Sequence, residues 1–439
     1  MRSVTFPGGI HPDYEKEPVA SRAIRESTVP ERIVIQMTQH VGAPCRPLVK
    51  KGDRVKMGQL VGEAVGFVSA PVHSSVSGLV ISVDRAPHPL GLELPSIIVE
   101  PDGEDECEFM EPIQNPLDED PKILKQRVRD GGLVGMGGAA FPTHVKLSPP
   151  PDKPIDTVLF NGTECEPYLT ADDRVMREDP HRVLKGMQVA AHIMGLRGGI
   201  ICIETNKPEA IEAISKECES FPGFRVQPLE VKYPQGGEKQ LIQAVLGREV
   251  PSGGLPMDCG VMVFNVNTCG AICDAVYEGR PLITRVTTVT GHGVERPANL
   301  RVRLGTSISH LLDQCGGFSR EPGKVILGGP MMGVAIHDLS VPVLKSVGGV
   351  LVQPRDEVLD QSYGPCIRCG NCVRACPMRL IPNELGNYAE KRLWEEAEER
   401  DLMDCMECGC CTYVCPAFRP LIHLIRTARA KVHEKRSKK

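Results

Sequence analysis

The sequence CIRCGNCVRACP at positions 366–377 decides the fold of the C-terminal part of this 439-residue chain. Its cysteines follow the spacing C-x2-C-x2-C-x3-C and are closed by a proline, and the sequence CMECGCCTYVCP at positions 405–416 repeats that spacing. Two such runs are typical of small helical domains that hold two 4Fe-4S clusters, with each thiolate on a different iron. Eight cysteines share the spacing, namely Cys366, Cys369, Cys372, Cys376, Cys405, Cys408, Cys411 and Cys415.

The fourth cysteine of each run is expected to serve the other cluster, as it does in two-cluster ferredoxins. We therefore predict that cluster one is bound by Cys366, Cys369, Cys372 and Cys415, and cluster two by Cys405, Cys408, Cys411 and Cys376. Zinc is the alternative partner of such thiols, but tetrahedral zinc sites explain poorly why the same run, with its proline, occurs twice. Cys410 falls outside the spacing and is predicted to be a packed thiol.

The segments next to the second run are predicted to be helical. Residues 382–400 carry a stripe of apolar side chains on one face of a single helix, at Leu385, Tyr388, Leu393 and Ala397. From Arg419 to the end there are eight basic residues against one acid, Glu434. Two interpretations of this basic tail are open: a solvated, frayed end, or a contact surface for anionic lipid or an acidic electron-carrier protein.

Composition and charge exclude several classes of protein. The net charge is −5, which argues against a nucleic-acid partner. No apolar run approaches the roughly 20 residues that span a bilayer, and the N-terminus carries no apolar signal-peptide segment. We therefore expect a cytosolic protein, or one bound peripherally to a membrane, whose cysteines do not form a disulfide framework.

The N-terminal region has the pattern of a small β domain. Residues 40–85 alternate between apolar and polar positions with frequent glycines, which suits short strands and tight turns. This stretch resembles the lipoyl/biotinyl barrel-sandwich family, but the expected hairpin tip, residues 67–78, contains no lysine to modify. We therefore predict a structural or docking role, with His73 as a structural residue. An acidic, proline-containing linker at 100–121 follows.

The central region alternates between predicted strands and helices, which indicates an α/β domain with a largely parallel sheet. Its glycine-rich loop at 132–146 offers free backbone N–H groups for a phosphate, with Lys146 as an added charge. A predicted strand at 157–160 is followed by Asn161, and a predicted strand at 261–268 ends in amide side chains, Asn265 and Asn267. Ligands of open α/β sheets bind at such strand ends.

Four segments of this region resemble the flavin-binding motifs of the NADH-oxidising subunit of respiratory complex I: residues 135–146, 161–167, 233–239 and 265–268. With the barrel-sandwich domain in front and the double cluster behind, nearly the whole chain resembles the C subunits of Rnf electron-transport complexes. The segments 6–12 and 67–71 are also typical of those subunits. Residues 282–336 resemble the β-grasp module of the family, in which the turn at 328–332 either lines the flavin site or is only a turn.

The resemblance implies roles for individual residues. Gly135, Gly137, Gly138 and Lys146 would hold the FMN phosphate, and Asn265 and Thr268 would complete that pocket. Asn161, Thr163 and Glu164 would face the flavin or its ribityl chain, and Tyr233, Gly236, Gly237 and Glu238 would border the isoalloxazine and the nicotinamide. Glu238 and Glu164 would be the catalytic carboxylates. For the glycines the alternative is a tight turn, and for the two acids it is a helix cap or a surface carboxylate.

The fold expected from these observations is multidomain, α/β and α+β. We predict a barrel-sandwich hybrid at 1–110, an FMN- and NADH-binding α/β domain at 111–280, a β-grasp module at 281–345 and a two-cluster ferredoxin-like helical domain at 355–439.

The resemblance implies a peripheral subunit of an ion-translocating ferredoxin:NAD+ oxidoreductase at the cytoplasmic face of the cell membrane. It would pass electrons between NAD(H), FMN and two 4Fe-4S clusters, with Rnf-type membrane subunits and a ferredoxin subunit as partners and either Na+ or H+ as the coupled ion. One alternative is a related flavin iron–sulfur reductase, such as a cobalamin reductase, in which the barrel-sandwich segment follows the clusters instead of preceding the flavin region. The other alternative is a relay subunit without a working flavin site.

Overall fold

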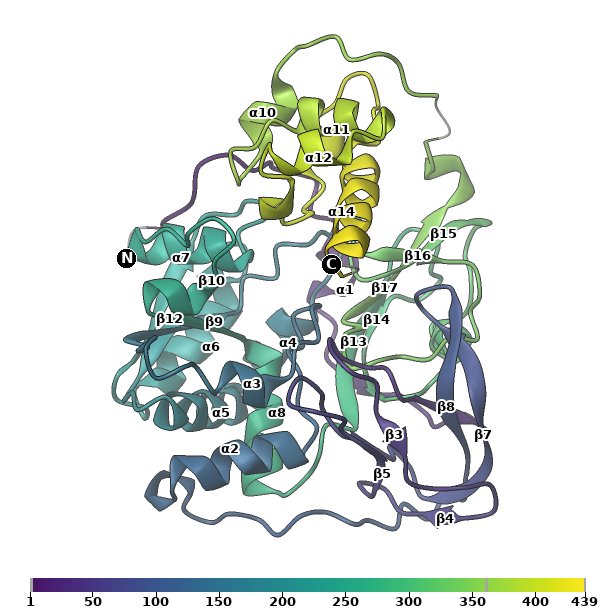
Figure 1. Ribbon diagram of the computed structural model, residues 1–439. Coiled ribbons are helices and arrows are strands. Elements are labelled where there is room, and N and C mark those ends of the chain that lie inside the picture. Colours follow the sequence, from purple (N-terminus) through teal and green to yellow (C-terminus); the bar gives the residue numbers. More distant parts are fainter. Residues whose placement is uncertain (1–2, 360–361, 438–439) are drawn as a thin grey trace.

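The computed structural model describes residues 3–359 and 362–437. Figure 1 shows four parts: an α/β domain, a β-grasp sheet beside it, a barrel-sandwich domain below that sheet, and a helical cysteine domain across the top. The predicted fold class is confirmed. Among the described residues no helix is long and apolar enough to cross a membrane.

The α/β domain is built on a parallel four-stranded sheet in the order β11-β10-β9-β12. Its strands are β9 (Thr157–Asn161), β10 (Gly199–Glu204), β11 (Phe224–Leu229) and β12 (Val261–Asn265). Its helices are α2 (Pro121–Asp130), α3 (Thr143–Lys146), α4 (Ala171–Glu178), α5 (Pro180–Ile193), α6 (Pro208–Cys218), α7 (Glu238–Leu246) and α8 (Val266–Tyr277), with 3-10 turns at Pro116–Asp118 and Pro256–Cys259. The central strands are continuous apolar runs because helices cover both faces of the sheet. Strand order reverses between β9 and β12, which creates a crevice at their carboxyl ends.

The barrel-sandwich domain consists of two small antiparallel sheets around a core that includes Ile33, Val61 and Ile97. One sheet holds β2 (Ile33–Gln36), β4 (Arg54–Val55), β7 (Gly78–His88) and β8 (Leu92–Pro101), and the other holds β3 (Arg46–Pro47), β5 (Leu60–Glu63) and β6 (Val72–His73). The short strands β3, β4, β5 and β6 agree with the alternating pattern over 40–85, whereas β7 and β8 form a long hairpin that extends beyond it. The loop between β5 and β6, residues 64–71, forms the hairpin tip. The predicted tip at 67–78 extends too far, since its later residues belong to β6, the following turn and the start of β7.

The β-grasp sheet has the order β1-β14-β13-β17-β15-β16. Its elements are β1 (Arg25–Glu26), β13 (Thr284–Thr290), β14 (Ala298–Arg303), β15 (Pro322–Leu327), β16 (Val334–Ile336), β17 (Gly349–Pro354) and α9 (Ile308–Gln314), followed by a 3-10 turn at Arg355–Glu357. The last strand, β17, lies beyond the predicted end of the module at residue 345, because it pairs with both β13 and β15.

The N-terminal segment before β2 is an extended arm that lies on the other parts of the molecule. It includes the short helix α1 (Glu17–Ala20). The Gly9 N–H donates to the carbonyl of Ala375 in the cysteine domain (2.9 Å), and Ile10 exchanges backbone hydrogen bonds with Tyr233 of the α/β domain. Further along, β1 pairs with β14. The predicted domain 1–110 therefore includes an arm that is not part of the barrel-sandwich sheets.

The cysteine domain contains α10 (Asn371–Ala375), α11 (Pro382–Glu390), α12 (Trp394–Glu398), a 3-10 turn at Leu402–Asp404, α13 (Cys410–Tyr413) and α14 (Leu421–Ser437). The prediction of one helix over 382–400 is wrong. The chain turns between α11 and α12, where Arg392 has a positive φ of 58°. Both short helices then pack against α14, which a single straight helix could not achieve.

The basic tail is also more ordered than a frayed end. Helix α14 buries Leu421, Ile425, Ala428 and Val432 against α11 and α12. Near its end, Lys435 pairs with Glu395 and Arg436 pairs with Glu398. The frayed-end interpretation is therefore wrong for the described part of the tail, and Lys438 and Lys439 lie outside the described residues.

Candidate functional site

Two asparagines meet at the crevice of the parallel sheet. Asn161 ends β9, Asn265 ends β12, and the two residues are directly paired in the sheet register. The Asn161 side chain donates to the Gly236 carbonyl (2.9 Å) and accepts from the Thr163 hydroxyl (2.7 Å). The Asn265 side chain caps α8 by accepting from the N–H of Asn267 (2.9 Å). Predicted residues from three separate segments therefore converge at the strand ends.

The glycine loop crosses these strand ends closely. The Met136 N–H donates to the Thr268 hydroxyl (2.9 Å), which fixes the loop to the first turn of α8. A Cβ on Gly137 would lie 3.4 Å from the Cβ of Asn265, and Gly138 has a φ of +111° with no atom near its outer side. The loop leads into α3, which has only four residues, so a helix dipole contributes little. Residues 137–139 are exposed, and their backbone is what the loop offers to an anion.

The predicted phosphate cation and one predicted catalytic acid lie in contact. Lys146, at the end of α3, forms an ion pair with Glu238, the first residue of α7. The Lys146 ammonium also lies 5.7 Å from the centre of the Phe264 ring in β12. Both charges are only partly exposed and stand beside the strand ends, where a ligand phosphate could compete for the ammonium.

Glu164 is held in a way that the catalytic prediction did not anticipate. Its carboxylate accepts hydrogen bonds from the N–H groups of Asp172 (2.7 Å) and Asp173 (3.1 Å) in the first turn of α4. Burial raises the pKa of Glu164 to about 7. These contacts describe a helix cap, which was the alternative interpretation, and they give the carboxylate a positioning role.

A buried cation that the sequence did not reveal supports the same segment. The Lys16 ammonium, from the N-terminal arm, donates to the carbonyls of Glu164 (2.8 Å), Glu166 (2.9 Å) and Leu169 (2.5 Å). Burial lowers the pKa of Lys16. No local spacing could have identified it, because its three acceptors are backbone atoms about 150 residues away.

Glu166 joins the same segment to the β-grasp turn at 328–332. Its carboxylate accepts from the N–H groups of Met331 (3.2 Å) and Met332 (2.8 Å). Burial raises the pKa of Glu166 to about 6. The same turn approaches the cysteine domain, since a Cβ on Gly409 would lie 3.1 Å from the Met331 carbonyl oxygen. The turn therefore connects the strand-end segment with the cysteine domain.

Tyr233 connects the α/β domain with the cysteine domain directly. Its side chain is 1% exposed, and its hydroxyl donates to the carbonyl of Cys408 (2.8 Å). The hydroxyl is therefore engaged at the cysteine domain, whereas the sequence placed this residue at the isoalloxazine. The neighbouring glycines are required by close packing: a Cβ on Gly236 would lie 2.4 Å from the Thr163 hydroxyl, and one on Gly237 would lie 2.7 Å from Met406.

The cysteines of the two runs line two separate cavities, and each cavity takes its fourth cysteine from the other run. One is lined by Cys366, Cys369, Cys372 and Cys415, and the other by Cys376, Cys405, Cys408 and Cys411. This is the crossed arrangement predicted for clusters one and two. No three metal-binding side chains converge on one point within 3–359 and 362–437. A cubane cluster fits four thiols around a hollow, because each thiol binds a different iron. Cys410 is fully buried, as predicted for a packed thiol, and it also lines the second cavity beside Cys408 and Cys411.

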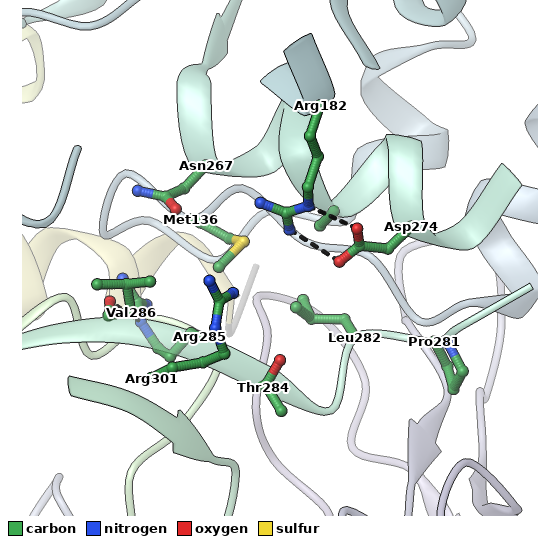
Figure 2. A pocket seen from close by; sticks show the side chains of 11 residues that line it. Met136, Arg182, Asn267, Asp274, Pro281, Leu282, Thr284, Arg285, Val286 and Arg301 are labelled. Carbon is green, nitrogen blue, oxygen red and sulfur yellow. Dashed lines mark hydrogen bonds and ion pairs between the residues drawn. The ribbon is translucent and has the colours of Figure 1, made fainter. Parts of the chain in front are cut away.

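A further small cavity lies between the α/β domain and the β-grasp sheet (Figure 2). The Met136 side chain points into it, and Arg182 and Asp274 form a two-bond ion pair at its wall (2.6 and 2.8 Å). Arg285 enters from β13, buried, with its guanidinium donating to the carbonyl of Lys345. One side of the glycine loop is thus packed on the interdomain seam, while residues 137–139 stay exposed on the loop.

Models of four protein families match the chain in the order of its parts. They are the RnfC barrel sandwich hybrid domain over residues 4–104, the Nuo51 FMN-binding domain over 128–274, the SLBB domain over 286–335 and the 4Fe-4S dicluster domain over 365–418. The chain therefore carries an FMN-binding domain and a domain for two 4Fe-4S clusters.

A likeness to one solved structure supports the fold, and only the fold. The chain is similar to one of NAD+-reducing [NiFe]-hydrogenase in the H2-reduced state, with a TM-score of 0.50 and 18% identity, over 71% of this chain and 64% of that one.

Curated relatives cover nearly the whole chain. The chain is 46% identical to the C subunit of the Na(+)-translocating ferredoxin:NAD(+) oxidoreductase complex of Acetobacterium woodii, over 99% of this chain and 98% of the relative. It is 47% identical to the C subunit of the proton-translocating ferredoxin:NAD(+) oxidoreductase complex of Clostridium ljungdahlii, over 97% and 94%. It is 42% identical to the C subunit of the ion-translocating oxidoreductase complex of Rhodobacter capsulatus, over 100% and 85%. With this likeness over its full length, and with the RnfC domain at its N-terminus, the chain belongs to the family of C subunits of ion-translocating ferredoxin:NAD+ oxidoreductase (Rnf) complexes.

Proposed function

We propose that this chain passes electrons between NAD(H) and a one-electron carrier protein, as the NAD(H)- and FMN-binding subunit of an ion-translocating ferredoxin:NAD+ oxidoreductase. The FMN-binding and dicluster domains supply the two kinds of centre that such a path needs. Bound FMN exchanges two electrons with a nicotinamide and single electrons with an iron–sulfur cluster. The names of the relatives supply the donor and acceptor class.

The Tyr233–Cys408 hydrogen bond carries the proposal, because it joins the predicted flavin segment to a predicted ligand of cluster two. A second link lies nearby, where the Asp404 carboxylate accepts from the N–H of Gly253 (2.9 Å). Cluster two therefore adjoins the α/β domain. Cys369, by contrast, is exposed together with its neighbour Ile367, which puts cluster one on the outside. We assign the order nicotinamide, FMN, cluster two, cluster one, carrier protein.

The chain's own residues would bind and orient the flavin and the nicotinamide. We propose that the backbone of Gly135, Gly137 and Gly138, with Lys146, Asn265 and Thr268, holds the FMN phosphate, and that Asn161 and Thr163 hold the ribityl chain and ring. Gly236, Gly237 and Glu238 would border the nicotinamide. Glu164 would keep α4 in place below this cleft, and Tyr233 would hold the cleft against cluster two.

Partners and location follow from the family. We propose that the protein binds peripherally at the cytoplasmic face of the membrane, through other Rnf-type subunits and an electron-carrier ferredoxin subunit. The two relatives at 46% and 47% identity are named for different ions, Na+ and H+. We therefore assign the choice of ion to the partner subunits.

Anaerobically purified protein tests the proposal. We expect about eight irons and about one FMN per chain, and NADH should bleach both the flavin and the cluster absorbance. If the purified protein contains clusters but no FMN, the chain is a relay subunit and not an NADH-oxidising one. FMN that NADH does not reduce would point to a reductase with another electron donor.

A further inference from the structure

The hairpin tip of the barrel-sandwich domain lies against the glycine loop of the α/β domain. Beside the tip, the loop between β2 and β3 makes a further contact: the Val41 N–H donates to the carbonyl of Ala140, in the middle of the glycine loop (3.1 Å). At the end of the loop, Nε2 of His144 is 3.0 Å from the carbonyl of Phe67. The two rings of His144 and Phe67 also meet edge to face, with centres 5.7 Å apart. In a carrier domain this tip would present a lysine, whereas here it presents backbone groups and Phe67 to the loop.

The start of the loop is fixed by a buried lysine from the β-grasp region. The Lys345 ammonium donates to the carbonyl of Pro71, at the end of the hairpin tip (2.8 Å), and to the carbonyl of Gly132, at the start of the loop (2.7 Å). Lys345 is 0% exposed. Gly132 has a φ of +66°, and a Cβ there would lie 3.0 Å from the Lys345 nitrogen. One side chain thus ties three domains together at the loop.

The protonation state of His144 allows it to donate a hydrogen bond to the Phe67 carbonyl. The side chain is 3% exposed, and burial lowers its pKa, so the imidazole is neutral at physiological pH. A carbonyl only accepts, so the proton must sit on Nε2 and be donated to Phe67. The other ring nitrogen, Nδ1, has no partner among the described residues. The ring therefore makes one directed hydrogen bond, from the end of the loop to the barrel-sandwich tip.

We propose that the barrel-sandwich domain clamps the glycine loop at its start, middle and end, and so sets the affinity of the chain for FMN. His144 and Lys345 are positioning residues in this clamp. The proposal rests on the proposed function, in which this loop holds the FMN phosphate. A loop with several glycines loses much conformational freedom when it is ordered for a ligand. Holding it in advance removes that cost from the binding step.

Three variants of the full chain test the clamp. His144→Leu removes the donor, and His144→Gln keeps an N–H near the position of Nε2. His88→Leu is the matched control, because His88 is also a buried histidine (5% exposed) with Nε2 beside a backbone carbonyl, that of Thr38 (3.1 Å). It lies in the barrel-sandwich domain, away from the glycine loop. FMN affinity is measured by fluorescence titration of deflavinated protein. We expect a Kd about tenfold higher for His144→Leu, the size of one lost buried hydrogen bond, and within about twofold of wild type for the other two.

Hydrogen–deuterium exchange of residues 132–146, without FMN, separates failure of the clamp from failure of the proposed function. The clamp predicts faster exchange there in His144→Leu and unchanged exchange in His88→Leu. If wild type binds FMN but His144→Leu matches it in both Kd and exchange, the clamp is wrong and the proposed function stands. If wild type binds no FMN, the proposed function is wrong. The proposal that the clamp sets FMN affinity is then wrong as well, whatever the hydrogen–deuterium exchange shows. Equal losses in His144→Leu and His88→Leu would mean general destabilisation and would overturn the clamp.

Discussion

Lys146 and Glu238 come from segments 92 positions apart and meet at the strand ends. The sequence predicted a site role for both, for Lys146 because a lysine after a glycine loop can bind a phosphate, and for Glu238 through the resemblance to the flavin-binding motifs. Their pairing could not be read from the sequence, since it depends on how α3 and α7 are placed by the sheet. The ion pair keeps the ammonium near the position where a phosphate would bind.

Replacing Lys146 with Met should weaken FMN binding by roughly tenfold or more, because the phosphate loses a charge-assisted hydrogen bond. Fluorescence titration of deflavinated protein measures the change. Lys153→Met is the matched control, since Lys153 pairs with Asp258 on the surface of the same domain. Equal affinities for the two variants would show that Lys146 does not contact the phosphate.

His73 makes the stability of the fold depend on pH. Burial lowers the pKa of His73 to about 3, so the folded protein keeps the ring neutral while the unfolded chain protonates it near its ordinary pKa of 6.5. Stability is therefore lost as the pH falls through 6.5. Between about pH 7.5 and about pH 5.5, we expect His73→Leu to lose about 1.4 kcal/mol less than wild type in denaturant unfolding. The same pH dependence in both proteins would contradict the burial argument.

The role of a residue could be predicted from the sequence where the spacing of a motif alone determines it. The eight cysteines are placed as expected because their spacing brings them to two loops whatever the rest of the chain does. Lys16 and Lys345 were missed because their partners are backbone carbonyls supplied by distant segments. A lysine that binds carbonyls leaves no matching acid in the sequence. Glu164 caps a helix that begins only a few residues later, which was the alternative interpretation of this acid.

At the scale of elements, the contact between α5 and α8 decides where the strand-end residues lie. A Cβ on Gly186 in α5 would lie 1.7 Å from the carbonyl oxygen of Cys269 in α8. The two helices can approach this closely only through the glycine. Because α8 begins at the strand end, this contact also sets the position of Thr268 under the glycine loop.

Gly186→Ala should therefore destabilise the protein by roughly 1–3 kcal/mol through overpacking. The sign of the change in unfolding free energy is informative, because helix propensity alone would make alanine more stable than glycine in a helix interior by about 1 kcal/mol. Urea unfolding measures it, with Gly364→Ala as the control, because nothing lies within 4 Å of the Gly364 position. A stabilised Gly186→Ala protein would mean that the helices are not in tight contact.

Elements were predictable where a pattern is long and local. The apolar run of β9 forms a strand where the sequence predicted it. The prediction of a strand over 261–268 is wrong at its end, because β12 stops at Asn265 and α8 begins at Val266. The break between α11 and α12 was missed because the apolar stripe continues through the turn at Arg392. Strand β1 was missed because two residues carry no periodic signal, and its pairing partner, β14, lies far along the chain.

For the whole molecule, the proposed electron path runs from the cysteine cavity beside the α/β domain to the cavity where Cys369 is exposed. Cys369→Ser should remove cluster one while NADH still reduces FMN and cluster two. We expect about four fewer irons and the loss of electron transfer to added ferredoxin. Cys107→Ser, at an exposed free cysteine, should match wild type. Loss of flavin reduction by NADH in Cys369→Ser would contradict the proposed order.

The N-terminal arm has a consequence for how the protein is made. The arm is synthesised before the domains that it contacts, since Gly9 bonds to Ala375 of the cysteine domain. The arm also contacts Tyr233 and β14, so its binding sites emerge one after another during translation. Domains generally fold as units in the order of synthesis, but this arm must wait for the cysteine domain. Assembly of the cysteine domain is therefore the step that fixes the arm, and a ribosome-bound nascent protein lacking that domain should expose the arm to protease.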